Sequence, residues 1–474
     1  MEVPTTTSNP ITNPGISSEA QEFIKLAVPL AGAQVAQALV GFVDTLMMGH
    51  LGAESLAAGG LASSVFQLVL NTFSGVVMAV SPVVAEAYGA GRKGQVARIA
   101  RQGLWLAVLL GIPIMFVVSH LDWVMMRLGQ AEQTVRLADG YLDYILWGFV
   151  PALGFAMLRG YVAALSQARP VMIIVLLGAI ANITGNYVLG YGQFGFPRME
   201  LEGLGLASGL SFWFMFLALF LYTVRNQSLK EYPYWHKLHR LRPQLLWQLI
   251  VIGTSIAVTI AVEYGLFTVV TFFMGTLGTE TLAAHQTVYQ TVFLLFMVPL
   301  GMSYAVTVRV GQWMGQRDRT STRQAGYVGI AAAAVFMGLT AIALLVFRQQ
   351  IIGIYLDVND PAAAGVMNLA IPMLIIAALA QFLDGVQRVA MGSLYGLQDT
   401  RAPMILSVAT FWGIGLTSGY VLGFSMGFGG IGLWIGQSLG VAFAGLIFLG
   451  RFHSLTHKRN FERLERRHPS HHHP

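Results

Sequence analysis

Three acidic residues lie inside long apolar stretches of this 474-residue sequence: Asp44, Glu263 and Asp384. A carboxylate within a bilayer costs about 2.5–3.5 kcal/mol on insertion scales, so such residues are candidates for function by default. Intramembrane acids mark ion pathways and proton relays, and carboxylate oxygens also bind hard metal ions. We therefore expect these acids to be functional sites, and to take up a proton or a small metal ion.

The sequence around each acid leaves a structural alternative open. Glu263 has no Lys or Arg within one helical turn, which suits a proton carrier or, with more oxygens nearby, a sodium ligand. Its alternative is a protonated acid that is hydrogen-bonded to a neighbouring helix. Arg388 follows Asp384 by four residues, so an ion pair within one helix is the alternative there. For Asp44 the alternative is a solvated carboxylate near the outer membrane surface.

Two amide side chains are candidate partners of Asp44 in a cation site. Asn182 and Asn186 are four residues apart in one apolar stretch, so both face the same side of a helix. Amide oxygens coordinate hard cations, although hydrogen bonding between helices explains the pair equally well. Since the amides and Asp44 belong to the same half of the chain, we expect one cation site there. The full set of expected coupling residues, which would also ligate Na⁺, is Asp44, Asn182, Asn186, Glu263 and Asp384.

The elements that position these residues are membrane-spanning helices. Hydrophobic residues make up 55% of the sequence and charged residues only 11%, against about 25% charged in a typical soluble domain. Lipid offers no partner to an unpaired backbone amide, so each span must be helical, and the fold class is an all-α integral membrane protein. We expect twelve spans, at residues 24–48, 56–82, 100–119, 141–164, 170–191, 203–225, 246–275, 282–308, 326–347, 370–396, 403–424 and 431–451.

The basic residues predict the orientation of these spans. Of the 28 Lys and Arg residues, only Arg127, Arg136, Arg198 and Arg348 fall on one side of the predicted topology. The positive-inside rule places the other side, with both termini, in the cytoplasm. We expect a multi-pass protein of the bacterial inner (plasma) membrane. The net charge of +6 then reflects contact with anionic lipid, and no nucleic-acid partner is needed to explain it.

The second half of the chain repeats the first. Residues 44–58 and 270–284 match at nine of fifteen positions with a constant offset, and Tyr187-Val-Leu-Gly190 reappears as Tyr420-Val-Leu-Gly423. Six spans per copy is an even number, so the two repeats run parallel in the membrane, as in transporters built from two similar halves. The predicted organisation is a disordered tail (1–20), an N-lobe (21–225), a cytoplasmic linker on the membrane surface (226–245), a C-lobe (246–451) and a basic tail (452–474).

Signatures of enzymes are missing from the sequence. It has no phosphate-binding loop of the Walker A type, no HExxH motif and no nucleophile elbow. It also has no cysteine, so thiolate metal sites and cysteine nucleophiles are impossible. We expect a protein that is not an enzyme and needs no cofactor.

Three stretches resemble the multidrug and toxic compound extrusion (MATE) family in its NorM-type branch. They are residues 41–52, residues 299–312, and residues 384–400 with Asp384-Gly-Val-Gln387 and Gly392-Ser-Leu-Tyr-Gly396. The resemblance covers roughly residues 20–450. It implies two six-helix lobes around a central cavity, and export of amphipathic cations in exchange for Na⁺ or H⁺. It also implies that Asp44, Glu263 and Asp384 bind the coupling cation and the cationic substrate.

The mechanism expected from this resemblance is antiport by alternating access. Ionised acids attract the cationic cargo, aromatic side chains such as Tyr289 and Phe293 hold its apolar body, and an entering cation then releases it. We expect a monomer surrounded by lipid. The hypothesis predicts that Glu263→Gln and Asp384→Asn each abolish efflux without abolishing expression. The alternatives are a flippase for lipid-linked sugars, whose anionic cargo would favour basic linings, and a membrane-embedded enzyme.

Overall fold

The computed structural model describes residues 15–120, 122–127, 132–355, 361 and 363–467, and nearly all of them are helical. Within these described residues, eleven helices are long and apolar enough to cross a membrane, and α6 with α7, bent by 49° at their junction, makes a twelfth when the pair is counted as one span. Every span predicted from hydropathy is present. Apolar runs of about 20 residues must be helical in lipid, which is why composition alone predicts them well.

The helices of the first half are α1 (Ile16–His50), α2 (Ala53–Val77), α3 (Val80–Gly89), α4 (Lys93–Val118), α5 (Asp122–Arg127), α6 (Glu132–Leu146), α7 (Phe149–Ala164), α8 (Arg169–Gly185) with the π-helix η1 (Asn186–Gly190), and α9 (Glu200–Arg225). A 3₁₀ turn, η2 (Gln227–Leu229), lies in the linker. Those of the second half are α10 (Pro243–Leu277), α11 (Thr279–Gly315), α12 (Arg319–Val346), α13 (Arg348–Tyr355), α14 (Ala363–Gly396), α15 (Arg401–Ser407), η3 (Val408–Leu416), α16 (Thr417–Tyr420), η4 (Val421–Ser425), α17 (Gly429–Leu455) and α18 (Lys458–Arg467).

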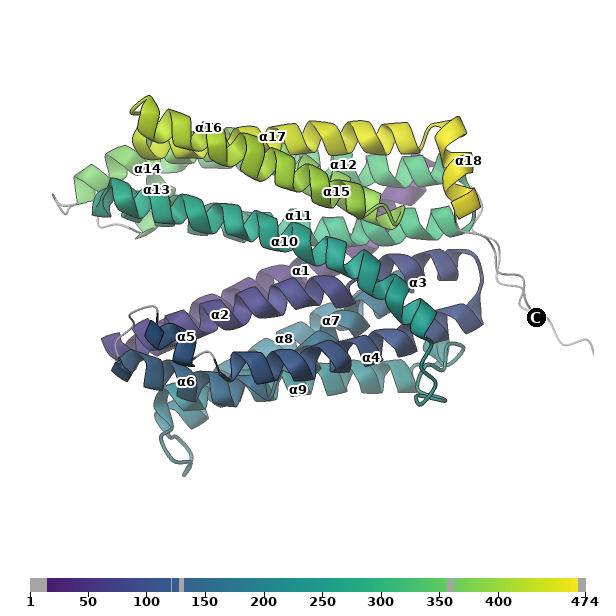
Figure 1. The fold of residues 1–474 in the computed structure, drawn as a ribbon, viewed down its shortest axis with the longest axis horizontal. Helices are drawn as coiled ribbons and strands as arrows, with labels where there is room; N and C mark the ends of the chain where they lie inside the picture. The colour runs from purple at the N-terminus through teal and green to yellow at the C-terminus, as the bar shows by residue number, and fades with distance from the viewer. Residues whose placement is uncertain (1–14, 121, 128–131, 356–360, 362, 468–474) are drawn as a thin grey trace, which may run out of the picture.

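The two halves of the chain form two groups of helices side by side. Figure 1 shows the helices of the first half below and those of the second half above, with α10 leaning across toward the first group. The groups meet where α1 packs on α11, α2 on α10 and α3 on α11. We call the end of the molecule that holds the linker and α18 the linker end; it lies at the right of Figure 1.

The internal repeat is visible in the backbone. Gly52 and Gly278, at matching positions, join α1 to α2 and α10 to α11, and both have positive φ (124° and 131°) with nearly equal ψ (166° and 162°). Only glycine adopts such angles readily, so both copies keep it. The repeated Tyr-Val-Leu-Gly motif also lies at a π-helix in each half, at η1 and at η4.

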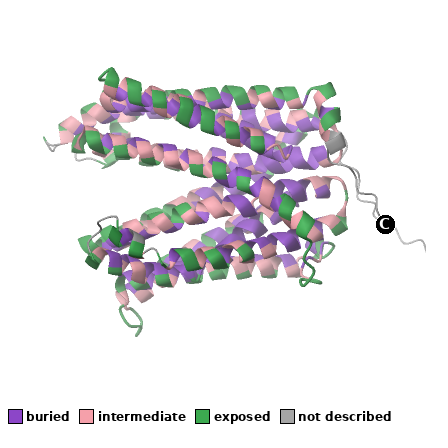
Figure 2. Cartoon of the chain, viewed as in Figure 1, coloured by how far each residue is buried: buried purple, intermediate pink, exposed green. Residues whose placement is uncertain are grey.

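Close backbone packing joins the two halves near the linker end. A β-carbon at Gly301 of α11 would collide with the backbone of Leu30 and Ala31 of α1, and one at Gly253 of α10 would collide with Val76. The same holds for Gly89 and Gly315, which pack on the facing backbone of α11 and α3. Figure 2 shows the facing segments buried at this end and more exposed toward the other. The halves are therefore sealed at the linker end.

A buried ion pair reinforces this seal. Glu19 at the start of α1 accepts hydrogen bonds from Nε and Nη2 of Arg309 in α11, at 2.8 and 2.5 Å, and from the indole of Trp313 at 3.0 Å. Arg309 also donates to Gln312, which donates in turn to the carbonyl of Ala164, the last residue of α7. Bidentate arginine–carboxylate pairs are among the stronger side-chain interactions. The network ties both halves together at one point.

The structure corrects the predicted start of the N-lobe and adds detail to the linker and the basic tail. Residues 16–20 are helical, because Glu19 is anchored to the second half; residues 1–14 of the predicted tail lie outside the described part of the chain. The linker contacts protein on one side: Tyr234 is fully buried, and Trp105 of α4 donates to the carbonyl of Leu238 at 2.6 Å. In the basic tail, α18 is helical and buries Phe461.

Candidate functional site

The first-half acid lies in a chain of directed hydrogen bonds. Nδ2 of Asn186 donates to Oδ1 of Asp44 at 2.6 Å and to Oδ1 of Asn182 at 3.3 Å. Nδ2 of Asn182 donates to Oγ of Ser208 in α9 at 3.0 Å. Asp44 and the two amides therefore lie together, and α1, α8, η1 and α9 supply the members of the chain.

This cluster leaves one buried acceptor without a partner among the described residues. Oδ1 of Asn186 is buried and makes no hydrogen bond there, although the side chain is fully enclosed. With Asp44 ionised, turning the amide around would bring its oxygen against the Asp44 carboxylate and against Oδ1 of Asn182, so the orientation described here is the favoured one. A buried acceptor normally has a donor or an ion beside it, and leaving it bare costs about 1–3 kcal/mol. Carboxylate and amide oxygens are both ligands that suit a small cation, and this cluster contains the Asp44 carboxylate and the bare Asn186 oxygen.

The backbone at Asn186 helps to create this arrangement. Asn186 is the first residue of η1, where α8 changes from an α-helix to a π-helix. Such π-helical segments are rare and are often found at functional sites. The wider turn after Asn186 also lets Tyr191 reach the carbonyl of Met47 in α1 at 2.9 Å. The acid and its amides are thus fixed by contacts on both sides.

The second half pairs its acids differently from the expectation. Nη2 of Arg388 in α14 forms a buried ion pair with Oε2 of Glu263 in α10, and the guanidinium lies 5.0 Å from the ring centre of Phe296. Asp384 forms no hydrogen bond or ion pair with any residue in the described ranges. The intrahelical pair of Asp384 with Arg388 is therefore absent, since the guanidinium reaches across to α10.

Aromatic rings stack beside this second acid cluster. On α11, His285, Tyr289 and Phe293 follow one another at helical spacing, with ring centroids 5.9 and 5.8 Å apart. Phe267 of α10 lies 5.7 Å from Tyr289. Both Tyr289 and Phe293, expected to contact the cargo, thus belong to one aromatic column, which begins at a buried histidine held by Thr271 at 2.9 Å.

The expected site residues therefore fall into two clusters, one in each half. Asp44 and its amides form the first, while Glu263 and Asp384, with Arg388, form the second. No group of three or more His, Asp or Glu side chains suited to a metal ion occurs in the part of the chain that the structure describes. A metal ion bound in either cluster would therefore need uncharged oxygen ligands, such as amide or hydroxyl oxygens, in addition to the carboxylates. Sequence reasoning missed Ser208 and the Glu263–Arg388 contact, because no local spacing links α9 to α8 or α14 to α10.

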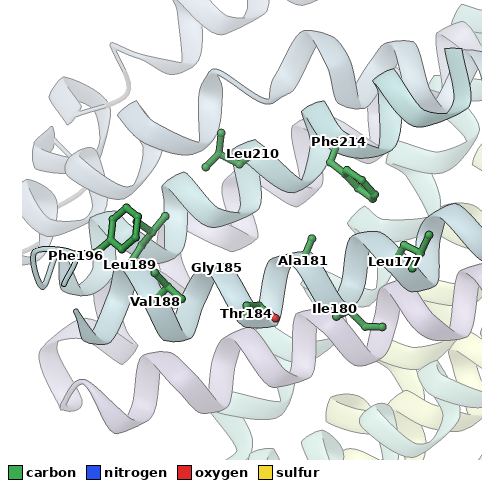
Figure 3. A pocket seen from close by; sticks show the side chains of 10 residues that line it. All are labelled: Leu177, Ile180, Ala181, Thr184, Gly185, Val188, Leu189, Phe196, Leu210 and Phe214. Carbon is green, nitrogen blue, oxygen red and sulfur yellow. The ribbon is translucent and has the colours of Figure 1, made fainter. Parts of the chain in front are cut away.

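A separate apolar groove lies on the outer surface of the first half. It has a volume of about 520 Å³ and runs between α8–η1 and α9, where Ile180, Leu210 and Phe214 line it from both sides (Figure 3). Thr184 supplies the one hydroxyl in its lining. With no charged group and strongly exposed apolar side chains, this groove suits lipid contact and takes no part in either acid cluster.

Known proteins resemble this chain along most of its length. The family model MatE matches residues 29–188 and 255–421. A protein named probable multidrug resistance protein NorM, from Synechococcus sp., is 58% identical over 97% of this chain and 99% of its own length. A protein of the same name from Pseudomonas aeruginosa is 38% identical over 90% of this chain and 88% of its own length.

Solved structures share the fold at low sequence identity. The crystal structure of MATE in complex with MaL6 has a TM-score of 0.84 at 19% identity and covers 96% of this chain and 100% of that one. The crystal structure of the eukaryotic MATE transporter AtDTX14 has a TM-score of 0.83 at 18% identity, with coverage of 96% and 100%. At these identities the likeness concerns the fold alone, and it confirms the predicted twelve-span architecture.

Proposed function

Because the chain belongs to the MatE family, we propose that it is a secondary active transporter that exports amphipathic, mostly cationic compounds in exchange for Na⁺ or H⁺. Its similarity to proteins named for multidrug resistance supports the export of small molecules. The transporter works as a monomer in the bacterial inner membrane and needs no cofactor beyond the coupling ion. Membrane lipid is its immediate environment.

One observation supports the proposed coupling of export to Na⁺ or H⁺. Within apolar spans, Asp44 meets Asn186, whose buried carbonyl oxygen is bare among the described residues. A carboxylate and an amide oxygen that lack a counter-cation are poised to take up a proton or Na⁺. Occupation of this position by a cation would neutralise the first cluster, so a cationic cargo would no longer be attracted. Inward movement of each charge gains about 2.3 kcal/mol per 100 mV of membrane potential.

The seal at the linker end supports alternating access. The positive-inside rule predicts, from the Lys and Arg distribution, that this end is cytoplasmic; the predicted N-lobe and C-lobe (21–225 and 246–451) then meet tightly on the inner side. Release of cargo to the outside requires such a closed inner end, and uptake from the cytoplasm requires that it opens. The two lobes, joined by the linker (226–245), rock relative to each other between these states.

The acid clusters also discriminate against the alternatives. A flippase for anionic lipid-linked sugars would need unpaired basic residues in its cavity. In these two clusters, as far as the structure describes their surroundings, Arg388 is held by Glu263, and the acids without a basic partner are Asp44 and Asp384. An enzyme would need a nucleophile activated by a neighbouring base, whereas the Ser208 hydroxyl of the first cluster accepts a hydrogen bond from the neutral amide of Asn182. Cation-coupled export remains the function that fits the geometry best.

Efflux from proteoliposomes tests the proposal. Purified protein is reconstituted with a fluorescent lipophilic cation such as ethidium inside the vesicles, and an inward gradient of either Na⁺ or H⁺ is imposed. We expect dye export with one gradient and none without a gradient. The Asp44→Asn variant should lose the gradient dependence. Equal export with and without gradients would refute ion-coupled transport.

A further inference from the structure

Arg388 places a positively charged side chain inside the second acid cluster. Its side chain is buried in α14, and its guanidinium is held by Glu263 of α10 and by the face of Phe296 of α11. Arginine remains protonated in proteins, so this charge is permanent. Glu263 therefore already has a counter-ion. In the first half, no described cation stands beside Asp44, whose hydrogen-bond partner is the neutral amide of Asn186.

Asp384 differs from Glu263 in two respects that bear on binding a cation. It lies one turn before Arg388 on α14, yet it has no hydrogen bond or ion pair with a described residue. Its exposure is intermediate, whereas Glu263 is buried. The two acids and the arginine carry one net negative charge, and that charge is available at Asp384.

We propose that the two acids have separate tasks: Asp384 binds the cationic cargo, and Glu263 is a positioning residue that keeps Arg388 away from Asp384. This inference rests on the proposed function, because it concerns the same cation-coupled export. Asp384 and Arg388 are four residues apart on one helix, a spacing at which opposite charges pair readily. Only the stronger, buried partner on α10 prevents that pairing.

The proposal makes an unusual prediction for the variants of Glu263. In Glu263→Gln, Arg388 loses its partner and turns to the nearest remaining acid, Asp384, which it neutralises. Export is then lost although Glu263 never touches the cargo. In the double variant Glu263→Gln/Arg388→Gln, both members of the pair are neutral and Asp384 is free again. The net charge of the cluster is the same as in the wild type.

Dye export from proteoliposomes distinguishes these cases. We expect Glu263→Gln, which removes one partner of a buried charge pair, and Asp384→Asn, which removes the unpaired carboxylate, each to reduce export by roughly tenfold or more. The double variant Glu263→Gln/Arg388→Gln should recover most of the wild-type rate. The double variant Asp384→Asn/Arg388→Gln, the matched control, should remain inactive. A double variant that stays as inactive as Glu263→Gln would show that Glu263 itself is needed, and would overturn the proposal.

A binding measurement makes the test independent of turnover. Detergent-solubilised variants are titrated with ethidium, and its fluorescence reports the affinity. Binding should fall in Glu263→Gln, return in Glu263→Gln/Arg388→Gln and stay weak in both Asp384→Asn variants. If the double glutamine variant is not monodisperse, Glu263→Met/Arg388→Met replaces it, because apolar residues of similar volume often substitute for buried ion pairs without loss of stability. Lack of gradient-driven export by the wild type would refute the proposed function, whereas lack of rescue in binding refutes this inference alone.

Discussion

The seal between the halves predicts a measurable shift when Glu19 is neutralised. Glu19 and Arg309 are almost fully buried, with side-chain exposures of 1% and 5%, and three hydrogen bonds end on the carboxylate. Removing one member of such a pair leaves an uncompensated charge and costs about 3–5 kcal/mol. Since 1.36 kcal/mol corresponds to a factor of ten, Glu19→Gln should lower the equilibrium constant that favours the closed over the open inner end by about two to four powers of ten.

The absence of cysteine from the sequence allows a direct assay. Single cysteines at Gly94 and Thr320, exposed positions at the linker end of the first and second halves, carry spin labels for distance measurement. We expect Glu19→Gln to add a longer distance component that is minor in the wild type. Glu22→Gln is the matched control, because Glu22 forms an exposed pair with Lys25, worth about 0–1 kcal/mol. Identical distance distributions in all three proteins would refute the reasoning.

Three further predictions concern individual contacts. Asp44→Asn keeps the size of the side chain but removes its charge, so gradient-driven dye efflux should fall about tenfold or more while expression persists, as seen by size-exclusion chromatography. Gly301→Leu forces a side chain against the backbone of α1 and should cost at least about 1–3 kcal/mol in a thermal unfolding assay, whereas Gly60→Ala, which has open space, should not. Tyr289→Ala removes the centre of the aromatic column, worth about 0.5–1.5 kcal/mol per ring pair, and should raise the dye KM about two- to tenfold.

Hydropathy and the internal repeat are sufficient to determine the architecture. Each span must satisfy its backbone hydrogen bonds within itself, so a run of about 20 apolar residues specifies a helix locally, and all twelve are found. The repeat likewise predicts like geometry in both halves, as Gly52 and Gly278 show. Asp44, Asn182 and Asn186 can be grouped from the sequence because helical spacing aligns the amides and one half contains all three.

Tertiary structure alone decides the partners of the charges. Arg388 stands four residues from Asp384, yet it pairs with Glu263, 125 residues away in the chain. Glu19, in a segment whose polar composition predicts a tail, is buried against Arg309, 290 residues away. An ion pair depends on where two side chains meet in space, and no periodicity in the sequence encodes a meeting between distant helices. Packing of α10, α14 and α1 against α11 brings these groups together and thereby decides which acids are left free for a cation.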